Sequence, residues 1–225
     1  MLFAGLAVGT VIGKRVAVTE LPQTVAAFHA LVGLAAMATS IASYITHNDP
    51  TAFHSIASFM GTFIGGVTLT GSIAAFIKLA NILRNKNLTL PMSSMLNTPL
   101  SLLSLAALST MLYTDSIPLG VAMLTLSCFT SAALGWNVIF SIGAADMPVA
   151  ITVLNSYSGW ALCAEGFMLA NPMLTIVGSL IGSSGAILSY IMCRAMNRSL
   201  YNVVFGKMGE AKGKAMEITG THTEI

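Results

Sequence analysis

Three polar side chains of the sequence, His29, Ser72 and Asn155, stand within stretches that are otherwise apolar. Imidazole is the side chain whose unperturbed pKa lies nearest to neutral pH, so a histidine can take up and release a proton under ordinary conditions. An amide and a hydroxyl group can each donate and accept a hydrogen bond. A histidine flanked by these two groups is therefore suited to taking up a proton and passing it on, provided that the fold brings the three side chains together.

Charged residues and Pro or Asn breaks divide the chain into seven apolar segments, which must position these side chains. The segments comprise residues 1–13, 22–46, 55–82, 99–114, 117–142, 147–170 and 173–193. A helix needs about 20 apolar residues to span a bilayer, and most of the segments are long enough. The first segment begins at Met1 without the charged region of a signal peptide. We therefore interpret it as the second half of a spanning helix whose beginning is missing.

The composition indicates a membrane protein and excludes several other classes. Of the 225 residues, 55% are hydrophobic and 8% are charged, whereas soluble domains carry about 25% charged residues. The net charge of +2 excludes a nucleic-acid binder, which needs a dense basic patch. Three cysteines in apolar runs do not make a disulfide framework, and together with four scattered histidines they show no metal-ligand spacing. We predict an all-α, polytopic transmembrane helix bundle with about seven spanning helices, the first of them truncated, embedded in a lipid bilayer.

The basic residues predict how this bundle is oriented. If the seven segments cross the membrane in alternation, all the Lys and Arg residues fall on one side. These residues are Lys14, Arg15, Lys78, Arg84, Lys86, Arg194, Arg198, Lys207, Lys212 and Lys214. The loops on the other side, around residues 47–50, 115 and 171–172, contain no Lys or Arg. By the positive-inside rule, the N-terminus lies outside and the C-terminus lies on the basic side, which faces the matrix or the cytoplasm.

His29, Ser72 and Asn155 are expected at one depth in the membrane. His29 lies about seven residues and Asn155 about eight residues into their segments from the basic side, and Ser72 lies about ten residues from the basic end of its own. At 1.5 Å per residue these are depths of roughly 10–15 Å. A proton or substrate path accounts for such a layer, because polar side chains are costly within a bilayer. Hydrogen bonding between helices as a packing contact accounts for it as well, and the residues alone leave both interpretations open.

Two acids and a helix rich in small residues are further candidates. Asp146 precedes the sixth segment, with Pro148 two residues later, which is the pattern of a helix N-cap. It is also one of two acids in loops on the basic side before the C-terminal tail. Glu165, near the opposite end of that segment, is a candidate proton entry or an interfacial acid whose charge reaches water. Gly182 and Gly185 belong to a stripe of small residues in the last segment, which lets helices pack at backbone contact.

Five stretches of the chain closely resemble the membrane domain of proton-translocating NAD(P) transhydrogenases. They are residues 27–36 (AFHALVGLAA), 65–72 (GGVTLTGS), 146–160 (DMPVAITVLNSYSGW), 182–199 (GSSGAILSYIMCRAMNRS) and 216–225 (MEITGTHTEI). The stretches are spread over almost the whole chain, and the long ones are highly specific to this family.

The resemblance implies a three-part enzyme. One soluble domain binds NAD(H), another binds NADP(H), and hydride passes directly between the two nicotinamides. The membrane domain couples hydride transfer from NADH to NADP⁺ to the inward movement of protons. The resemblance further implies that the residues matched by His29, Ser72 and Asn155 line the proton path.

The same resemblance assigns residues that couple the membrane domain to the soluble ones. Asp146 is expected where the membrane domain faces the NADP-binding domain. Gly182, Gly185 and Arg198 are expected on the last helix and on the hinge into that domain. The sequence departs from the family at Ala144, where a second glycine is usual, and the added methyl group would stiffen this loop.

The resemblance also predicts which part of the enzyme this chain represents. Residues 1–204 are expected to form the transmembrane, proton-translocating domain, and residues 205–225 a linker and the start of an NADP-binding domain. We therefore expect a fragment that binds neither NAD nor NADP and is inactive alone. It would act with nucleotide-binding domains of the same chain or of other subunits, and the complete enzyme would be a homodimer. Residues 160–166 (WALCAEG) are similar to the mitochondrial form, which favours the mitochondrial inner membrane over a bacterial inner membrane.

Two functions of other classes remain as alternatives on the residues alone. One is a stand-alone seven-helix transporter, channel or receptor. A retinal protein is excluded because residues 173–193 contain no lysine, and the inverted repeats of many transporters are not evident. The other is a non-catalytic scaffold subunit whose partners carry both nucleotide sites.

Overall fold

The computed structural model describes residues 2–47, 51–80, 82, 93–114, 116–143, 146–197 and 199–201. Its regular elements in these ranges are all helical, which confirms the all-α class and the seven helices expected from the apolar segments. The elements are α1 (Leu2–Arg15), the short 3₁₀-helix η1 (Val18–Glu20), α2 (Leu21–Thr46), α3 (Ala52–Leu79), α4 (Ser93–Tyr113), α5 (Ile117–Ser141), α6 (Met147–Met168) and α7 (Pro172–Ala195).

Local signals in the sequence explain where several helices begin. The Thr51 side chain accepts a hydrogen bond from the His54 nitrogen at 3.3 Å and so caps α3. Asn171 caps α7 in the same way, with its side-chain oxygen 3.1 Å from the Met173 nitrogen. A proline occupies the first or second position of α2, α5, α6 and α7, where its missing N–H costs nothing because the first helical N–H groups have no intrahelical acceptor.

The fourth helix begins earlier than the sequence predicts. We expected it to start at Pro99, but α4 begins at Ser93 and contains Pro99 in its interior. Proline removes one backbone hydrogen bond and crowds the preceding turn. This penalty weakens the first turns of α4 without ending the helix there.

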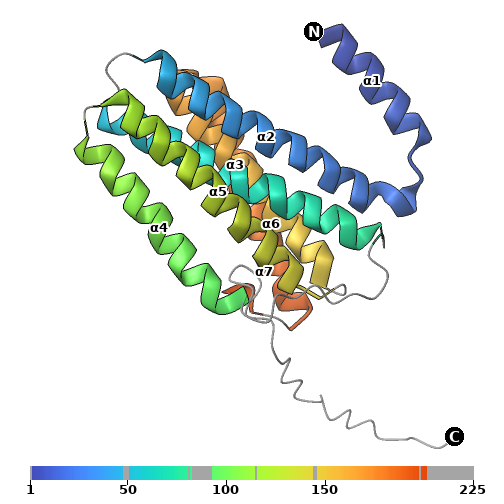
Figure 1. The fold of residues 1–225 in the computed structure, drawn as a ribbon. Coiled ribbons are helices and arrows are strands. Elements are labelled where there is room, and N and C mark those ends of the chain that lie inside the picture. The colour runs from blue at the N-terminus through green and yellow to red at the C-terminus, as the bar shows by residue number, and fades with distance from the viewer. Residues whose placement is uncertain are drawn as a thin grey trace, which may run out of the picture.

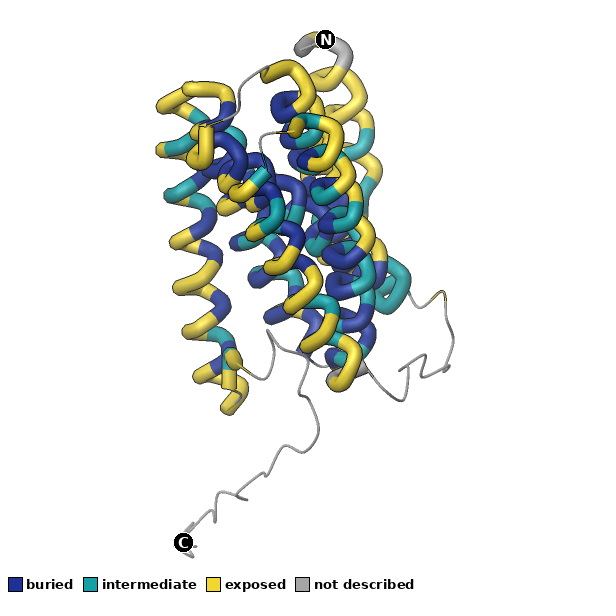
Figure 2. The backbone as a smooth tube through the Cα atoms, turned by 60° about the vertical axis from the view of Figure 1, so that its left-hand side comes forward, coloured by how far each residue is buried: buried dark blue, intermediate teal, exposed yellow. Residues whose placement is uncertain are grey.

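The helix α3 lies in the middle of the bundle. It packs against α2, α5 and α6, while α6 packs most extensively against α7 and α4 packs mainly against α5. Figure 1 shows this bundle with α1 standing apart from the other helices. The buried residues lie on the inward-facing sides of the helices (Figure 2). On α3 most of them are small, being glycine, alanine, serine or threonine, so that its neighbours approach closely.

Five helical stretches are long and apolar enough to cross a membrane among the residues described. They are Val18–Thr46, Ala52–Leu79, Met95–Tyr113, Ile117–Ser141 and Pro172–Ala195. The 14 residues of α1 are too few, and α6 carries a polar stretch around Asn155 that lowers its mean hydropathy. Because 13 residues of α6 are buried against other helices, this helix depends less on contact with lipid. Length and composition therefore support a membrane crossing for five of the seven helices. The crossing of all seven stays a prediction.

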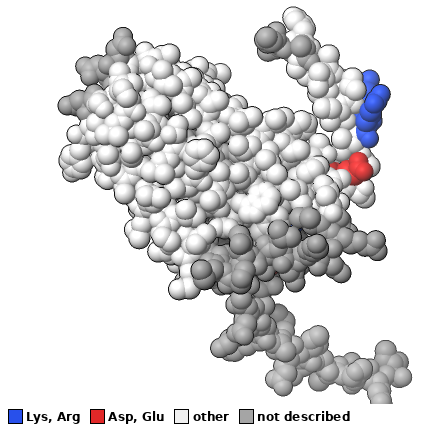
Figure 3. Space-filling view, in the orientation of Figure 1, with Lys and Arg blue, Asp and Glu red and all other residues white. Residues whose placement is uncertain are grey.

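The basic residues that the structure describes gather at one end of the bundle. Lys14 and Arg15 close α1, Lys78 lies in the last turn of α3, and Arg194 lies in the last turn of α7. In Figure 3 the visible charge is confined to the α1–η1 end, and the rest of the described surface on that face is uncharged. This distribution agrees with the predicted grouping of basic residues, whereas the side of the membrane that this end faces stays a prediction.

Candidate functional site

The structure joins two of the three predicted site residues by a hydrogen bond. His29 of α2 and Asn155 of α6 are both half-buried, and the His29 Nε2 lies 3.1 Å from the Asn155 Oδ1. The other ring nitrogen, Nδ1, lies 2.7 Å from the Val25 carbonyl oxygen and donates to it. Both imidazole nitrogens therefore have fixed partners, and one of these partners is a side chain from another helix.

The partners of His29 suit both of its protonation states. A carbonyl group accepts only, so Nδ1 keeps its proton in the neutral ring and Nε2 is then an acceptor. In the imidazolium both nitrogens donate, and the Asn155 carbonyl oxygen accepts from Nε2. An asparagine amide can be turned so that its NH₂ group donates instead. Asn155 can thus hold His29 whether or not the ring carries its second proton.

Backbone contact between α2 and α3 puts Ser72 at the level of His29. A Cβ atom on Gly33 would lie 2.6 Å from the Leu69 nitrogen, so the two helices touch there. His29 precedes Gly33 by one turn and Ser72 follows Leu69 by one turn. Because consecutive helices joined by a short connection run in opposite directions, both side chains lie one turn away on the same side of the contact.

A second contact relates Ser72 to the sixth helix. A Cβ on Gly71 would lie 3.1 Å from the Leu154 side chain, which immediately precedes Asn155. Ser72 itself is fully buried, and its hydroxyl oxygen makes no hydrogen bond within the described part of the chain. The three residues predicted at one depth therefore do lie at one level of the bundle, and Ser72 has its hydrogen-bonding capacity unused there.

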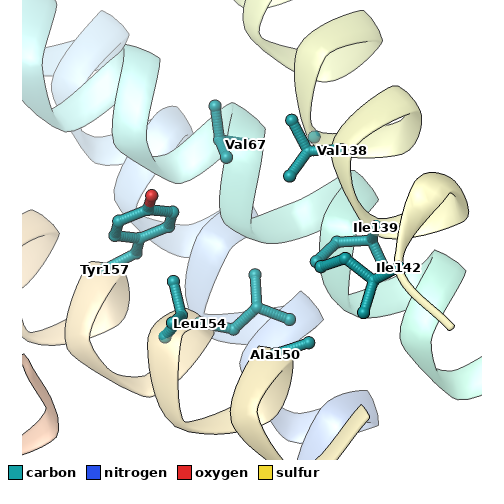
Figure 4. Close-up of a pocket in the computed structure, with 9 residues that line it drawn as sticks. Val67, Val138, Ile139, Ile142, Ala150, Leu154 and Tyr157 are labelled. Atoms are coloured by element: carbon teal, nitrogen blue, oxygen red, sulfur yellow. The ribbon is translucent and has the colours of Figure 1, made fainter. Parts of the chain in front are cut away.

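The other faces of α6 are apolar or tightly packed. Leu154, Ala150 and Tyr157 point into a small pocket of about 20 Å³ that α3 and α5 close with residues such as Val67 and Ile139 (Figure 4). The lining of this pocket is almost entirely carbon, and apolar cavities of this kind stay dry. Water or a proton is therefore better accommodated on the α2 side of α6, where Asn155 meets His29.

Glycines hold α6 against α7 at backbone contact. A Cβ on Gly159 would lie 2.7 Å from the Gly182 Cα, and one on Gly185 would lie 2.9 Å from the Ser156 Cα. The Ser156 hydroxyl donates to the Gly182 carbonyl oxygen at 2.7 Å. This geometry confirms the expected packing role of Gly182 and Gly185. It also fastens α7 to the residue that follows Asn155.

Asp146 does not cap α6 with its side chain, which corrects one interpretation of the sequence. It occupies the N-cap position, is only 4% exposed, and makes no side-chain capping hydrogen bond. Its backbone nitrogen instead donates to the Gly143 carbonyl oxygen at 3.1 Å. Since Pro148 starts the helix with a favourable backbone angle and lacks an N–H, α6 has less need of a capping side chain.

Glu165 lies near the far end of α6 and is half-buried. Its carboxylate accepts a hydrogen bond from the Thr39 side chain of α2. The interaction makes a second polar link between α6 and α2, about ten residues beyond the one at Asn155. An acid held in this way is neither deeply buried nor fully extended into solvent.

Some predicted residues lie outside the part of the chain that the structure describes. They are Arg198, Ala144 and the whole of the predicted linker at residues 205–225. The expectations for them stay predictions.

Sequence reasoning missed several polar contacts between helices, including three that lie apart from the predicted site residues. Lys78 donates to backbone carbonyls at the end of α5 and to that of Ile142, which follows it. At the opposite end of the bundle, His54 lies 3.1 Å from the Ser43 hydroxyl, and the His47 ring packs against it with centroids 4.2 Å apart. On the α6–α7 contact, Ser189 donates to the Thr152 hydroxyl at 2.9 Å. In the sequence, each contact is indicated only by a single polar residue in an apolar stretch. Such a residue does not predict which other residue it contacts.

A large cavity of the described residues has a lining that does not suit a dinucleotide. It is a groove of about 930 Å³ between α3, α4, α5 and α6, lined mostly by apolar side chains. Its α4 side contributes Asn97, Thr98 and Ser101, and no Lys or Arg lines it. Dinucleotide phosphates are bound by basic side chains or by the N-terminus of a helix after a glycine-rich turn, and neither lines this groove.

Comparison with known proteins places the chain in one family. The family model described as the NAD(P) transhydrogenase beta subunit matches residues 1–225. The NAD(P) transhydrogenase subunit beta of Rhodospirillum rubrum is 44% identical over 219 residues, which cover 94% of this chain and 46% of that protein. A second protein with the same name, from a named strain of that species, gives the same identity and coverage. The chain thus spans about half the length of the curated relatives it matches. It belongs to the NAD(P) transhydrogenase beta subunit family, and its apolar helices make it an integral membrane protein.

Proposed function

We propose that this chain is the proton-translocating membrane part of an NAD(P) transhydrogenase. In this proposal residues 1–204 form the membrane domain and couple hydride transfer from NADH to NADP⁺ to inward proton movement. Residues 205–225 lead into an NADP-binding domain. The observation that carries the proposal is the hydrogen bond between His29 and Asn155, which joins a titratable ring to a reversible amide partner within a bundle of apolar helices.

Proton transfer through this layer uses His29 as the carrier. The ring receives a proton on Nε2, is held as an imidazolium by the Asn155 oxygen, and returns to the neutral form when the proton leaves. Ser72 lies at the same level with a buried hydroxyl that bonds to no described residue, and it offers the next acceptor or donor. Glu165, on the same helix as Asn155, is the proposed entry from the opposite end.

Coupling to the nucleotide chemistry uses α6 and α7 as one unit. Asp146 stands at the start of α6, and the Ser156–Gly182 hydrogen bond ties α7 to the residue beside Asn155. A displacement at the basic end of either helix is therefore carried to the amide that holds His29. Gly182 and Gly185 serve this role by close packing, and Arg198 is the proposed hinge residue beyond α7.

The nucleotide sites belong to other parts of the enzyme in this proposal. NADP and NAD would be bound by separate domains, on the same chain or on partner subunits. We further propose seven crossings with the N-terminus outside, a homodimeric complete enzyme, and a mitochondrial or bacterial inner membrane. The grouping of described basic residues at one end of the bundle supports the orientation.

The test replaces His29 in the complete enzyme, meaning this chain together with the segments or subunits that carry the nucleotide sites. In proteoliposomes His29→Ala should lower proton movement at least tenfold, because it removes the titratable ring that is hydrogen-bonded to Asn155. His47→Ala, which alters an exposed histidine at the other end of α2, should leave proton movement within about twofold. Unchanged proton movement in His29→Ala would refute the assignment.

A further inference from the structure

Lys78 directs its charge into the bundle, although it stands at the end of a helix close to the membrane surface. Its ammonium nitrogen donates to three backbone carbonyl oxygens, those of Ile139 at 3.0 Å, Phe140 at 2.6 Å and Ile142 at 2.8 Å. The same nitrogen lies 5.2 Å from the centre of the Phe140 ring. An ammonium group has three N–H donors, so this side chain is fully engaged.

Two of the acceptors, Ile139 and Phe140, belong to the last turn of α5, and the third, Ile142, directly follows the last residue of that helix. A helix ends with carbonyl oxygens that lack intrahelical partners and carry partial negative charge. A lysine at a membrane interface ordinarily extends its charge into water, but Lys78 of α3 closes the end of a neighbouring helix instead. The interaction joins residues of two helices, and these residues are about 60 positions apart in the sequence.

The closed end of α5 leads directly into the connection that carries Asp146. Ile142, one of the three acceptors, precedes Gly143, and the Gly143 carbonyl oxygen accepts from the Asp146 nitrogen at 3.1 Å. The next residue, Met147, starts α6. On the other side, Lys78 follows Ser72 by six residues of continuous helix, about 9 Å along the axis.

We infer that Lys78 is a positioning residue, which fastens the α5–α6 connection to α3 and so sets the place of Asp146 relative to the layer of His29, Ser72 and Asn155. The inference rests on the proposed function in so far as Asp146 couples the membrane domain to the nucleotide chemistry. The fastening itself depends only on the three hydrogen bonds.

The test compares three variants in the complete enzyme. Lys78→Met keeps the length of the side chain and removes its donors and charge. Lys78→Arg keeps both, and Lys14→Met removes an exposed lysine at the end of α1 as the matched control. Two quantities are measured for each variant: hydrogen–deuterium exchange of the peptide covering residues 140–148, and protons moved per hydride transferred in proteoliposomes.

Lys78→Met should raise exchange in this peptide roughly tenfold, as expected from loss of at least one charge-assisted hydrogen bond. It should also lower the number of protons moved per hydride. Lys78→Arg should restore both quantities at least in part, and Lys14→Met should change neither. If Lys78→Met does not assemble, Lys78→Gln takes its place, because glutamine retains two N–H donors but has no charge. Its exchange and its number of protons moved per hydride should change in the same directions.

Unchanged exchange in Lys78→Met would refute the fastening, whatever the enzyme does. Raised exchange with an unchanged number of protons per hydride would refute the positioning role. If the wild-type enzyme moves no protons, the proposed function fails, and the exchange measurement still decides whether Lys78 holds the connection.

Discussion

Asn155→Leu should weaken proton transfer at His29 while leaving the helix bundle assembled. Leucine has the branched shape of asparagine, with methyl groups in place of the amide oxygen and nitrogen, and has no hydrogen-bonding group, so the change removes the 3.1 Å contact with the His29 Nε2 and little packing. A hydrogen bond between neutral groups contributes about 1 kcal/mol, and one to a charged group about 1.5–3 kcal/mol. The substitution therefore disfavours the imidazolium over the neutral ring by roughly 1 kcal/mol.

A difference of this size lowers the population of the protonated ring by a factor of about five. We expect proton movement by the complete enzyme in proteoliposomes to fall at least fivefold in Asn155→Leu. Asn155→Asp should behave differently, because a carboxylate accepts from the imidazolium and cannot donate to the neutral ring. It would stabilise the charged ring, slow the release of its proton and lower the turnover rate.

The effect of Asn155 should depend on the presence of His29. A double-mutant cycle tests this, since two residues that act through one contact give non-additive effects. In a His29→Ala background, Asn155→Leu should cause no further loss of proton movement. Wild-type rates in Asn155→Leu, or fully additive losses in the double variant, would refute the role that we give to this hydrogen bond.

Two further predictions concern the contact between α6 and α7. Gly159→Ala would put a Cβ 2.7 Å from the Gly182 Cα, and it should lower the free energy of unfolding, measured with denaturant in detergent, by about 1–3 kcal/mol. The control Gly9→Ala, where no atom lies within 4 Å of the new Cβ, should be neutral or stabilising by up to about 1 kcal/mol. Equal effects of the two substitutions would contradict the packing described. Thr152→Cys combined with Ser189→Cys should form a disulfide, because the two hydroxyl oxygens lie 2.9 Å apart. If α6 and α7 move as one unit, the oxidised enzyme should keep its coupled rate within about twofold. A loss of rate on oxidation that reduction reverses would show that the two helices must move apart.

Much of the fold could be predicted because membrane helices leave a simple signal. Long apolar segments between charged or Pro-containing breaks gave all seven helices, and counting residues from the basic ends placed His29, Ser72 and Asn155 at one level. This counting works because an α-helix has a fixed rise per residue and neighbouring spanning helices share a common thickness. The pairing of His29 with Asn155 required helix rotations that counting does not provide.

The rest depended on contacts that no single helix encodes. The end of α5 is closed by Lys78 of another helix, and nothing near Ile142 in the sequence indicates this. Asp146 has the sequence pattern of an N-cap, yet its side chain forms no capping bond. Pro99 marked the start of the predicted helix, whereas α4 begins at Ser93 and runs through this proline, because one lost hydrogen bond does not outweigh the other bonds of the helix.

We claim that this chain couples nucleotide chemistry to proton movement, so a proton gradient must change the rate of hydride transfer in the complete enzyme. The complete enzyme is reconstituted in proteoliposomes with a pH-sensitive dye inside, and NADPH formation from NADH and NADP⁺ is followed with and without an imposed proton gradient. We predict that a gradient directed toward the nucleotide side accelerates NADPH formation and that the reaction moves protons in the same direction. Hydride transfer at a rate that is independent of the gradient, with no movement of protons, would contradict the claim.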